Sequence, residues 1–419
     1  MARDDSCFCR IIPVGQWWSG LVEDNMKKIL FYCQSSLGIG HTIRSLRIAE
    51  GLSESFEVHY LNGGESISGL EIPLGIKCTD LPPIVSDPDF DTVHAVGSDL
   101  DVESTIERRR NLILRTFQHF APDIVLVELY PFGRGRFHAE LEPLLEYAKE
   151  HGSKIVCSVR DILTKREDQE AFERKVVKRM NRFFDLLLIH SDPDFQRLDD
   201  TFTRLDDIVA TKCYTGFVVP EVTSEPKRNG PTIIASIGGG RFGHELAEAV
   251  ARTAPLLAER IPHQIELYTG PFCPEDVADR LRQLAHGHPS IRVERFCPDL
   301  HQKLVTADLS ISMGGYNTIM NVIATGVPAM IMGCTNNGGM DQVARAEKLA
   351  RLGVVDVITP DDLAPETFAE KIISSLSREP AAVSLDINGV TATMRALSDL
   401  TGNHSAPEDH DGGEHPCVA

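Results

Sequence analysis

Residues 307–355 read ADLSISMGGYNTIMNVIATGVPAMIMGCTNNGGMDQVARAEKLARLGVV and decide the fold of this chain. Two apolar, β-rich runs alternate with two helical runs, in the order 307–312, 317–325, 329–332 and 341–351. Glycines stand between each strand and the helix after it, and Gly326 and Gly353 end the helices, as glycine commonly does. The stretch therefore predicts two neighbouring parallel strands whose glycine-bearing loops lead into helix N-termini. This geometry suits a bound anion such as a diphosphate.

Polar side chains on both helices indicate which kind of molecule carries the bound diphosphate. Residues three or four apart share one face of a helix. Here that face carries amide, hydroxyl, carboxylate and guanidinium groups: Asn317, Thr318 and Asn321 on the first helix, and Asp341, Gln342 and Arg345 on the second. Such groups bond phosphate oxygens and sugar hydroxyls. The pattern is typical of a nucleotide-sugar site.

Composition is that of a soluble globular protein. Of the 419 residues, 42% are hydrophobic and 25% are charged, and this length predicts two or three domains. The 61 acidic residues outnumber the 42 basic ones, and the resulting net charge of −19 disfavours a nucleic-acid partner. No apolar run is long enough to span a bilayer, which leaves peripheral membrane contact open.

Cysteine usage and the first residues indicate a cytoplasmic protein. The ten cysteines form no CxxC pair, and several, including Cys33, Cys157 and Cys213, fall in predicted strands. Buried thiols in a reducing compartment are therefore expected. Residues 1–26 lack the uninterrupted apolar core of a signal peptide and predict a flexible leader.

The order strand, glycine turn, helix repeats in each of two halves of the chain. Buried strands at 29–33 and 232–237 each begin one half, and residues 220–231 have the composition of a linker. A helix around 391–400 is expected to cross back to the first half. The expected divisions are a leader at 1–26, an N-terminal domain at 27–219, the linker at 220–231, a C-terminal domain at 232–401 and a disordered tail at 402–419.

Several motifs resemble those of a known family. GGYNT, GVPA and MDQ within 314–353 are similar to the donor-binding half of GT-B glycosyltransferases, in the MurG-like branch related to family 28. LGIGH…R at 37–44, PFGR at 131–134 and SVRDIL at 158–163 resemble a bacterial family of MurG-like predicted glycosyltransferases. The resemblance implies an α/β chain with two Rossmann-like, doubly wound domains that face a central cleft. It also implies hexosyl transfer from a nucleotide-diphosphate sugar, with a UDP-linked one expected, to an unidentified acceptor, without a metal or other cofactor.

The resemblance assigns the C-terminal domain to the donor. Gln342 is expected to bond sugar hydroxyls, Phe296 to border the nucleotide base, and Arg345 to neutralise phosphate or brace its loop. The alternatives are that Phe296 is a core residue and that the glycines only permit tight turns. The expected donor-binding residues are Gly238, Gly239, Gly240, Phe296, Gly314, Gly315, Thr318, Asn321, Asp341, Gln342 and Arg345.

The N-terminal domain is expected to present the acceptor and a general base. His41 follows the first glycine turn and begins a helix, whose N-terminus lowers the pKa of an imidazole and favours a neutral base; the alternative is a histidine that only hydrogen-bonds its loop. Glu128, at the carboxyl end of a strand, is a second candidate base. Arg160 and Asp161 either contact the acceptor or pair with each other. The expected acceptor-side residues are Gly40, Arg44, Arg134, Arg160 and Asp161.

Asn321 departs from the MurG-like pattern, which commonly has a glutamate at this position to accept hydrogen bonds from both ribose hydroxyls. An amide has one acceptor oxygen and one donor nitrogen, so it cannot accept twice at full strength. We therefore hypothesise altered ribose recognition, including tolerance of a 2′-deoxy nucleotide.

Two other functions fit the same residues. A nucleotide-sugar hydrolase would use water as the acceptor, and a catalytically inactive sugar-nucleotide-binding protein would bind the donor without turnover. Asp192-Pro193-Asp194 has the spacing of a metal-binding DxD motif, but similar strings recur at 87–91 in this acidic chain. No metal site is therefore expected.

Overall fold

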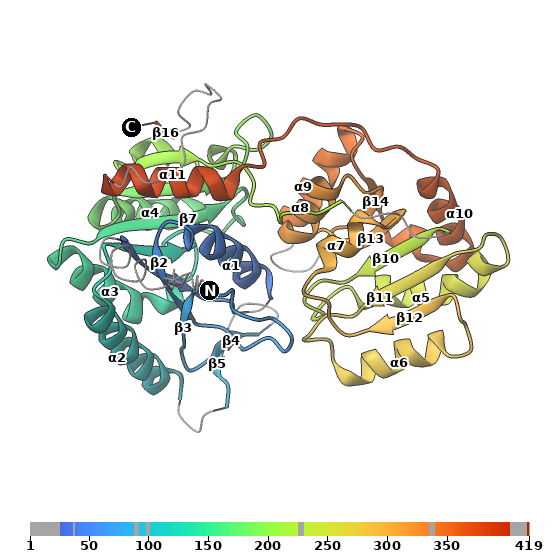
Figure 1. Cartoon of the computed structure of the whole chain (residues 1–419), viewed down its shortest axis with the longest axis horizontal. Helices are drawn as coiled ribbons and strands as arrows, with labels where there is room; N and C mark the ends of the chain where they lie inside the picture. Colours follow the sequence, from blue (N-terminus) through green and yellow to red (C-terminus); the bar gives the residue numbers. More distant parts are fainter. Residues whose placement is uncertain are drawn as a thin grey trace, which may run out of the picture.

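The structure is a computed structural model and describes residues 26–36, 38–87, 92–97, 101–224, 230–334, 340–402 and 417–418. Nearly all of the expected leader, most of the expected tail and the middle of the expected linker lie outside these residues. Figure 1 shows two α/β lobes side by side, one from each half of the chain. Two separate sheets thus confirm the two-part α/β architecture that the sequence predicts.

The first lobe is built on an eight-stranded sheet in the order β16-β9-β8-β7-β6-β1-β2-β3. Its strands are parallel, except that β16 pairs antiparallel with β9. Its elements before the linker are β1 (Lys28–Cys33), α1 (Gly40–Leu52), β2 (Glu57–Asn62), β3 (Lys77–Asp80), β4 (Ile84–Ser86), β5 (Val93–Ala95), α2 (Val102–Phe120), β6 (Ile124–Glu128), η1 (Gly135–Phe137), α3 (His138–Glu150), β7 (Lys154–Arg160), α4 (Gln169–Phe183), β8 (Leu186–His190), η2 (Leu198–Asp200), η3 (Leu205–Asp207) and β9 (Thr211–Tyr214).

The second lobe is built on a six-stranded parallel sheet in the order β12-β11-β10-β13-β14-β15. Its elements are β10 (Thr232–Ser236), α5 (His244–Ala258), β11 (Gln264–Tyr268), α6 (Glu275–Ala285), β12 (Ile291–Glu294), α7 (Leu300–Val305), β13 (Leu309–Met313), α8 (Tyr316–Thr325), β14 (Ala329–Met332), α9 (Met340–Arg351), β15 (Asp356–Ile358), η4 (Pro360–Leu363) and α10 (Pro365–Leu376). The stretch 307–355 therefore forms β13, α8, β14 and α9, in the predicted order.

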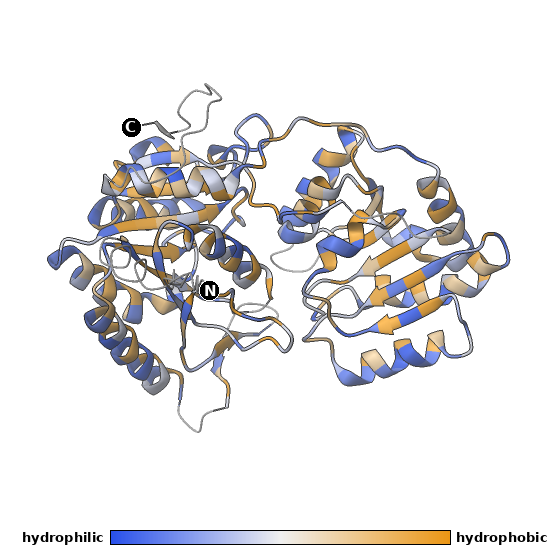
Figure 2. Cartoon of the chain, in the orientation of Figure 1, coloured by the Kyte–Doolittle hydropathy of each residue, from blue (hydrophilic) through white to orange (hydrophobic). Residues whose placement is uncertain are grey.

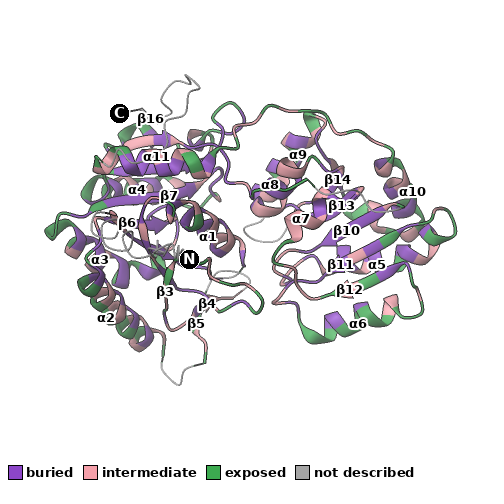
Figure 3. Ribbon diagram, in the orientation of Figure 1, coloured by how far each residue is buried: buried purple, intermediate pink, exposed green. Residues whose placement is uncertain are grey.

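The central strands of both sheets are buried on both faces. Every residue of β6, β8, β10 and β13 is buried, because helices cover each face of a parallel sheet. Figure 2 shows the central strands as largely hydrophobic, and Figure 3 shows them as buried, while the outer faces of helices such as α2 and α6 are polar and exposed. Burial of this kind explains why continuous apolar runs, rather than alternating ones, mark the strands in the sequence.

The end of the chain returns to the first lobe. Helix α11 (Gly389–Thr401) packs against α1 and contributes Met394, Ala396 and Leu397 to a core cluster with the first sheet, as the sequence predicts for this helix. It falls within the range 232–401 expected for the second domain, yet its apolar face is covered by the first lobe. Figure 1 shows α11 lying across that lobe.

Strand β16 (Cys417–Val418) lies within the range expected for the tail and pairs with the edge strand β9. Cys213 of β9 is disulfide-bonded, so the prediction of a buried thiol there is wrong, whereas Cys33 and Cys157 are the buried thiols expected. A short strand and the disulfide of Cys213 leave no periodic pattern in the sequence, which is why neither was predicted. No described helix is long and apolar enough to cross a membrane.

Candidate active site

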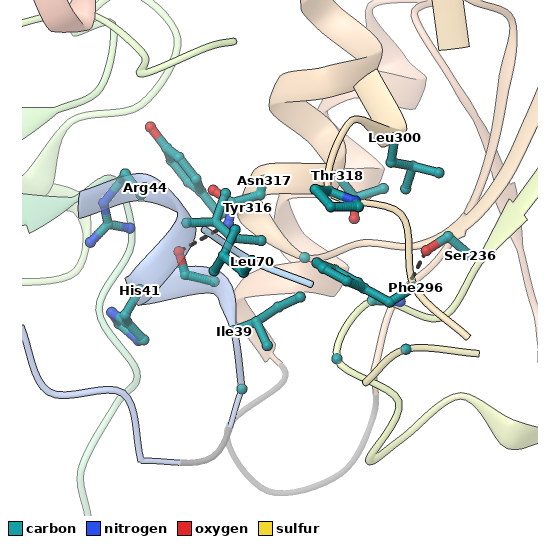
Figure 4. Close-up of a pocket in the computed structure, with 18 of the residues that line it drawn as sticks. Ile39, His41, Arg44, Leu70, Ser236, Phe296, Leu300, Tyr316, Asn317 and Thr318 are labelled. Atoms are coloured by element: carbon teal, nitrogen blue, oxygen red, sulfur yellow. Dashed lines mark hydrogen bonds between the residues drawn. The ribbon is translucent and has the colours of Figure 1, made fainter. Parts of the chain in front are cut away.

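A cavity of about 860 Å³ lies between the two lobes. It is lined by residues at or just after the ends of β1 and β7 in the first lobe and of β10, β12 and β13 in the second, so the carboxyl ends of both sheets face it. Figure 4 shows its walls, with His41 and Arg44 on α1 at one side and Phe296, Thr318 and Leu300 at the other. Ligands of doubly wound sheets bind at this end of the strands.

Most of the predicted site residues meet in this cavity. Gly239, Gly315 and Gln342 of the second lobe line it together with His41 of the first. Four predicted residues, Glu128, Asp161, Gly314 and Arg345, do not line it. The predicted residues that line it are Gly40, His41, Arg44, Arg134, Arg160, Gly238, Gly239, Gly240, Phe296, Gly315, Thr318, Asn321, Asp341 and Gln342.

His41 forms a hydrogen-bonded pair with Glu128. The Nδ1 atom of His41 lies 2.7 Å from Oε1 of Glu128, and Nη2 of Arg44 donates to the same oxygen at 2.5 Å. Glu128 is fully buried beneath these two side chains, so it cannot touch a ligand and is not the base that its position at the end of β6 suggests. Because an ionised carboxylate only accepts, it holds the proton of His41 on Nδ1 and leaves the lone pair of Nε2 free to accept a proton.

Burial, together with the neighbouring arginines, keeps His41 neutral. Burial lowers the pKa of His41 to about 4, and Arg134 and Arg44 add to this effect against the pull of Glu128. Burial alone would raise the pKa of Glu128, but His41, Arg44 and Arg134 outweigh it and hold that pKa at about 2. At neutral pH the pair is therefore an imidazole that hydrogen-bonds a carboxylate, which is the state that a general base requires.

Two helix N-termini are open to ligands in the cavity. Helix α1 begins after Ile39 and helix α8 after Gly315; no described side chain caps either residue, and neither first turn holds an acidic residue. Ile39 and Gly315 both line the cavity. The unpaired N–H groups and the positive end of each helix dipole therefore favour an anion here.

Glycine occupies several positions of the second lobe for different structural reasons. Gly240 has φ +88°, and a Cβ there would lie 2.4 Å from the carbonyl oxygen of Thr269. A Cβ on Gly239 would lie 3.7 Å from the backbone nitrogen of Ile39, so the glycine loops of the two lobes approach each other closely. Gly314 is buried against Gln342, where a Cβ would lie 3.3 Å from the carbonyl oxygen of that residue. Gly314 therefore allows close packing and does not contact a ligand.

Arg345 joins the two lobes instead of facing the cavity. It is fully buried, and its Nε and Nη2 atoms each donate to a different carboxylate oxygen of Asp161 at 2.8 Å. Asp341 accepts from Arg345 at 3.4 Å and lies 3.3 Å from Nη1 of Arg160. Asp161 and Arg160 thus each pair with the opposite lobe rather than with each other. This network fixes how the lobes face each other and orients Asp341 and Arg160 at the cavity wall.

Arg47 and Arg241 line the cavity and were not predicted as site residues. Arg47 of α1 donates from Nη2 to Oδ1 of Asn321 at 3.1 Å, while Nδ2 of Asn317, which was expected on the polar face of its helix, donates to the carbonyl of Gly40 at 2.9 Å. Arg241 pairs with Glu65 at 2.7 Å, again between lobes. Arg47 lies three residues beyond Arg44 on the same helix, and this spacing is the one sequence signal that pointed to it.

Unpartnered acceptors mark the places for ligand hydroxyls. Oε1 of Gln342 and Oδ1 of Asn317 are buried atoms with no hydrogen-bond partner among the described residues. A buried acceptor without a partner costs free energy unless a ligand or water satisfies it. By contrast, the side chain of Asp192 accepts from the backbone nitrogens of Asp194 and Asp386, so its role there is structural. Among the described residues no group of histidine, cysteine and acidic side chains could hold a metal ion.

Comparison with known proteins shows that the second lobe is similar to a known family. Residues 234–390 match the model of the glycosyltransferase family 28 C-terminal domain. The chain is 29% identical over 138 residues to UDP-N-acetylglucosamine--N-acetylmuramyl-(pentapeptide) pyrophosphoryl-undecaprenol N-acetylglucosamine transferase of Methylobacterium radiotolerans, which is 33% of this chain and 36% of the relative. The chain thus spans about a third of the length of this curated relative.

Two further similarities extend over both lobes. An uncharacterized glycosyltransferase of Methanosarcina acetivorans is 25% identical over 376 residues, covering 83% of this chain and 90% of the relative. The crystal structure of Acinetobacter baumannii MurG superposes with a TM-score of 0.53 at 16% identity, covering 90% of this chain and 99% of that one. The fold is therefore GT-B, as the sequence predicts.

Proposed function

We propose that this chain, a relative of the MurG-like, family 28-related glycosyltransferases, transfers a hexosyl group from a UDP-linked sugar to an acceptor hydroxyl without a metal ion. The observation that carries the proposal is the cavity itself, in which the open N-terminus of α8 and the unpartnered oxygen of Gln342 lie opposite the neutral imidazole of His41. These three groups suit a diphosphate, a sugar hydroxyl and an acceptor hydroxyl, respectively.

The proposed reaction follows from these placements. The diphosphate lies at Gly315 and Thr318, the sugar beside Gln342 and the base beside Phe296. Nε2 of His41 takes the proton of the acceptor hydroxyl while the acceptor oxygen bonds to the anomeric carbon. The bond from that carbon to the diphosphate oxygen breaks, and the N-terminus of α8 stabilises the negative charge on the departing UDP. The name of the curated relative, which begins with a UDP-linked sugar, supports UDP as the nucleotide.

The proposal is tested by incubating the protein with a panel of UDP-sugars, with and without candidate acceptors, and by identifying the sugar product. Transfer to an acceptor, with slow sugar release from donor alone, is expected. Rapid release of free sugar without an acceptor would show a hydrolase instead. Donor binding with no turnover in any mixture would show a binding protein. Activity is expected to persist after chelation of divalent metals, which the same assay measures.

Replacing Gly315 with alanine is expected to weaken UDP binding about tenfold, or about 1.4 kcal/mol, without lowering Tm. No described atom lies within 4 Å of a Cβ built on Gly315, so the methyl group fits the protein but occupies the space in front of the α8 N-terminus. Gly135→Ala is the matched control, because its Cβ also meets no atom within 4 Å and it lies outside the cavity lining. Calorimetry that gives the same UDP affinity for both variants would contradict a diphosphate at Gly315.

A further inference from the structure

We propose that Arg47 determines the specificity for the nucleoside half of the donor, and that it makes the site bind 2′-deoxyribonucleotides and ribonucleotides with similar affinity. The inference rests on the proposed function, because it concerns the nucleotide of the same donor. It gives Arg47, a residue of the first lobe, a role in binding the nucleoside, which the proposed function otherwise leaves to the second lobe.

The contact between Arg47 and Asn321 fixes the orientation of an amide. Nη2 of Arg47 lies 3.1 Å from Oδ1 of Asn321, and both residues line the cavity. A guanidinium group has donors and no acceptor, so the amide atom that faces it must be the oxygen. Asn321 is only 7% exposed, and the bond from Arg47 is what holds its amide oxygen in place. Its amide nitrogen is therefore the atom left for a ligand.

A second donor lies beside this amide. Nη1 of Arg47 is buried and has no hydrogen-bond partner among the residues that the structure describes. Glu50, one turn further along α1, and His301 also line the cavity. The pair of Arg47 and Asn321 thus offers the ligand N–H groups and no acceptor, since the single amide oxygen is already occupied.

The position of the pair matches the sugar ring of a nucleoside. Asn321 lies one turn after Thr318 on α8, and therefore one turn beyond the proposed diphosphate. Phe296 and Leu300 form the neighbouring wall, as Figure 4 shows. A nucleotide whose diphosphate lies at the start of α8 and whose base lies at Phe296 must place its pentose between them, next to Asn321.

The polarity of the pair decides how a pentose is recognised. A carboxylate would accept a hydrogen bond from each of the two ribose hydroxyls, so loss of the 2′-hydroxyl would remove one of them. The N–H groups of Asn321 and Arg47 instead donate to pentose oxygens. The 3′-hydroxyl and the ring oxygen can accept these hydrogen bonds in a ribonucleotide and in a 2′-deoxyribonucleotide alike. A site that does not use a hydroxyl as a donor discriminates weakly against the analogue that lacks it.

The test measures the affinities of UDP and 2′-deoxy-UDP by calorimetry, since these two ligands differ in one hydroxyl. The wild type is expected to bind both within about threefold. In Arg47→Met the amide of Asn321 is free to turn its oxygen toward the hydroxyls, so the preference for UDP is expected to rise to about tenfold. Arg241→Met is the matched control, because Arg241 also lines the cavity and pairs across the lobes with Glu65; its preference should equal that of the wild type.

An unchanged preference in Arg47→Met, or a strong preference for UDP in the wild type, would overturn the inference while leaving the proposed function intact. If the wild type binds neither nucleotide, the proposed function fails and this inference fails with it. Equal shifts in Arg47→Met and Arg241→Met would also overturn it, because any interlobe arginine would then have the same effect.

Discussion

Replacing His41 with alanine is expected to lower kcat about 1,000-fold and to leave the affinity for UDP unchanged. The imidazole is held by a buried carboxylate, with Nδ1 at 2.7 Å from Glu128, so that the lone pair of Nε2 is left to accept a proton. Its loss removes proton transfer from the acceptor hydroxyl. Gly315 and Thr318, the residues proposed to hold the diphosphate, line the cavity from the other lobe and are unchanged in this variant. Steady-state kinetics with calorimetry of UDP separates the two effects.

His138→Ala is the matched control for this variant. His138 is an exposed histidine of the same lobe, begins helix α3 and lies outside the cavity lining. Its replacement should change neither kcat nor UDP affinity. If His41→Ala retains wild-type kcat, His41 is not the base, and if it loses UDP binding in parallel, its role is to hold the donor.

The pH dependence of kcat/KM offers a separate prediction. The pKa of His41 is lowered to about 4, so its base form predominates at every pH above that value. The rate should therefore stay constant from about pH 8 down to about pH 5.5, whereas an imidazole with an ordinary pKa near 6.5 would lose about tenfold over this range. A tenfold fall between these pH values would show that His41 titrates normally and that its buried surroundings do not hold in solution.

Replacing Arg345 with methionine is expected to destabilise the folded protein by about 3–5 kcal/mol. The substitution removes the cation bonded to Asp161, which is fully buried and accepts two hydrogen bonds from Arg345 at 2.8 Å. An unpaired charge buried between the lobes costs far more than the pair contributes. Thermal unfolding should show a Tm lower by several degrees.

Two further variants make the test of Arg345 specific. Arg282→Met removes an arginine whose partners, Glu275 and Asp279, are exposed, and should leave Tm unchanged. Adding Asp161→Asn to Arg345→Met removes the stranded charge and should restore part of the lost stability. A wild-type Tm for Arg345→Met would show that the lobes are not joined through this pair.

Acidification should act on the same pair. Burial raises the pKa of Asp161, but Arg345 outweighs this effect and the pKa lies below its usual value. A depressed pKa contributes stability that is present above the unfolded-state pKa and is lost as the pH falls through the folded-state value. Wild-type Tm should therefore drop below about pH 4, and part of that drop should be absent in the double variant.

The second lobe could be predicted largely from local pattern. The run from β13 to α9 has apolar strands, glycine loops and glycine-terminated helices within a short segment, and each signal concerns neighbouring residues. The position of His41 at the start of α1 follows from the same kind of signal. Thus the residues placed at the ends of strands and the starts of helices were found, because parallel sheets bring these ends together.

The parts that could not be predicted depend on residues far apart in the chain. Asp161 and Arg345 are 184 residues apart, and Arg47 and Asn321 are 274 apart. The polar face of α9 does not reveal which of its residues meets the cavity and which meets the other lobe. Glu128 ends a strand that is buried on both faces, so sequence could not distinguish a residue in the cavity from one beneath it.

Amide hydrogen–deuterium exchange with and without saturating UDP tests the central claim most directly, because it shows where the diphosphate binds. We expect protection of the amides at 236–242, the loop after β10, and at 313–321, the loop after β13 and the start of α8, together with 38–44 as the lobes close on the ligand. Segments remote from the cavity, such as helix α2, should exchange as before. Protection confined to the first lobe, or no protection at 313–321 under saturating UDP, would contradict a donor site at the N-terminus of α8.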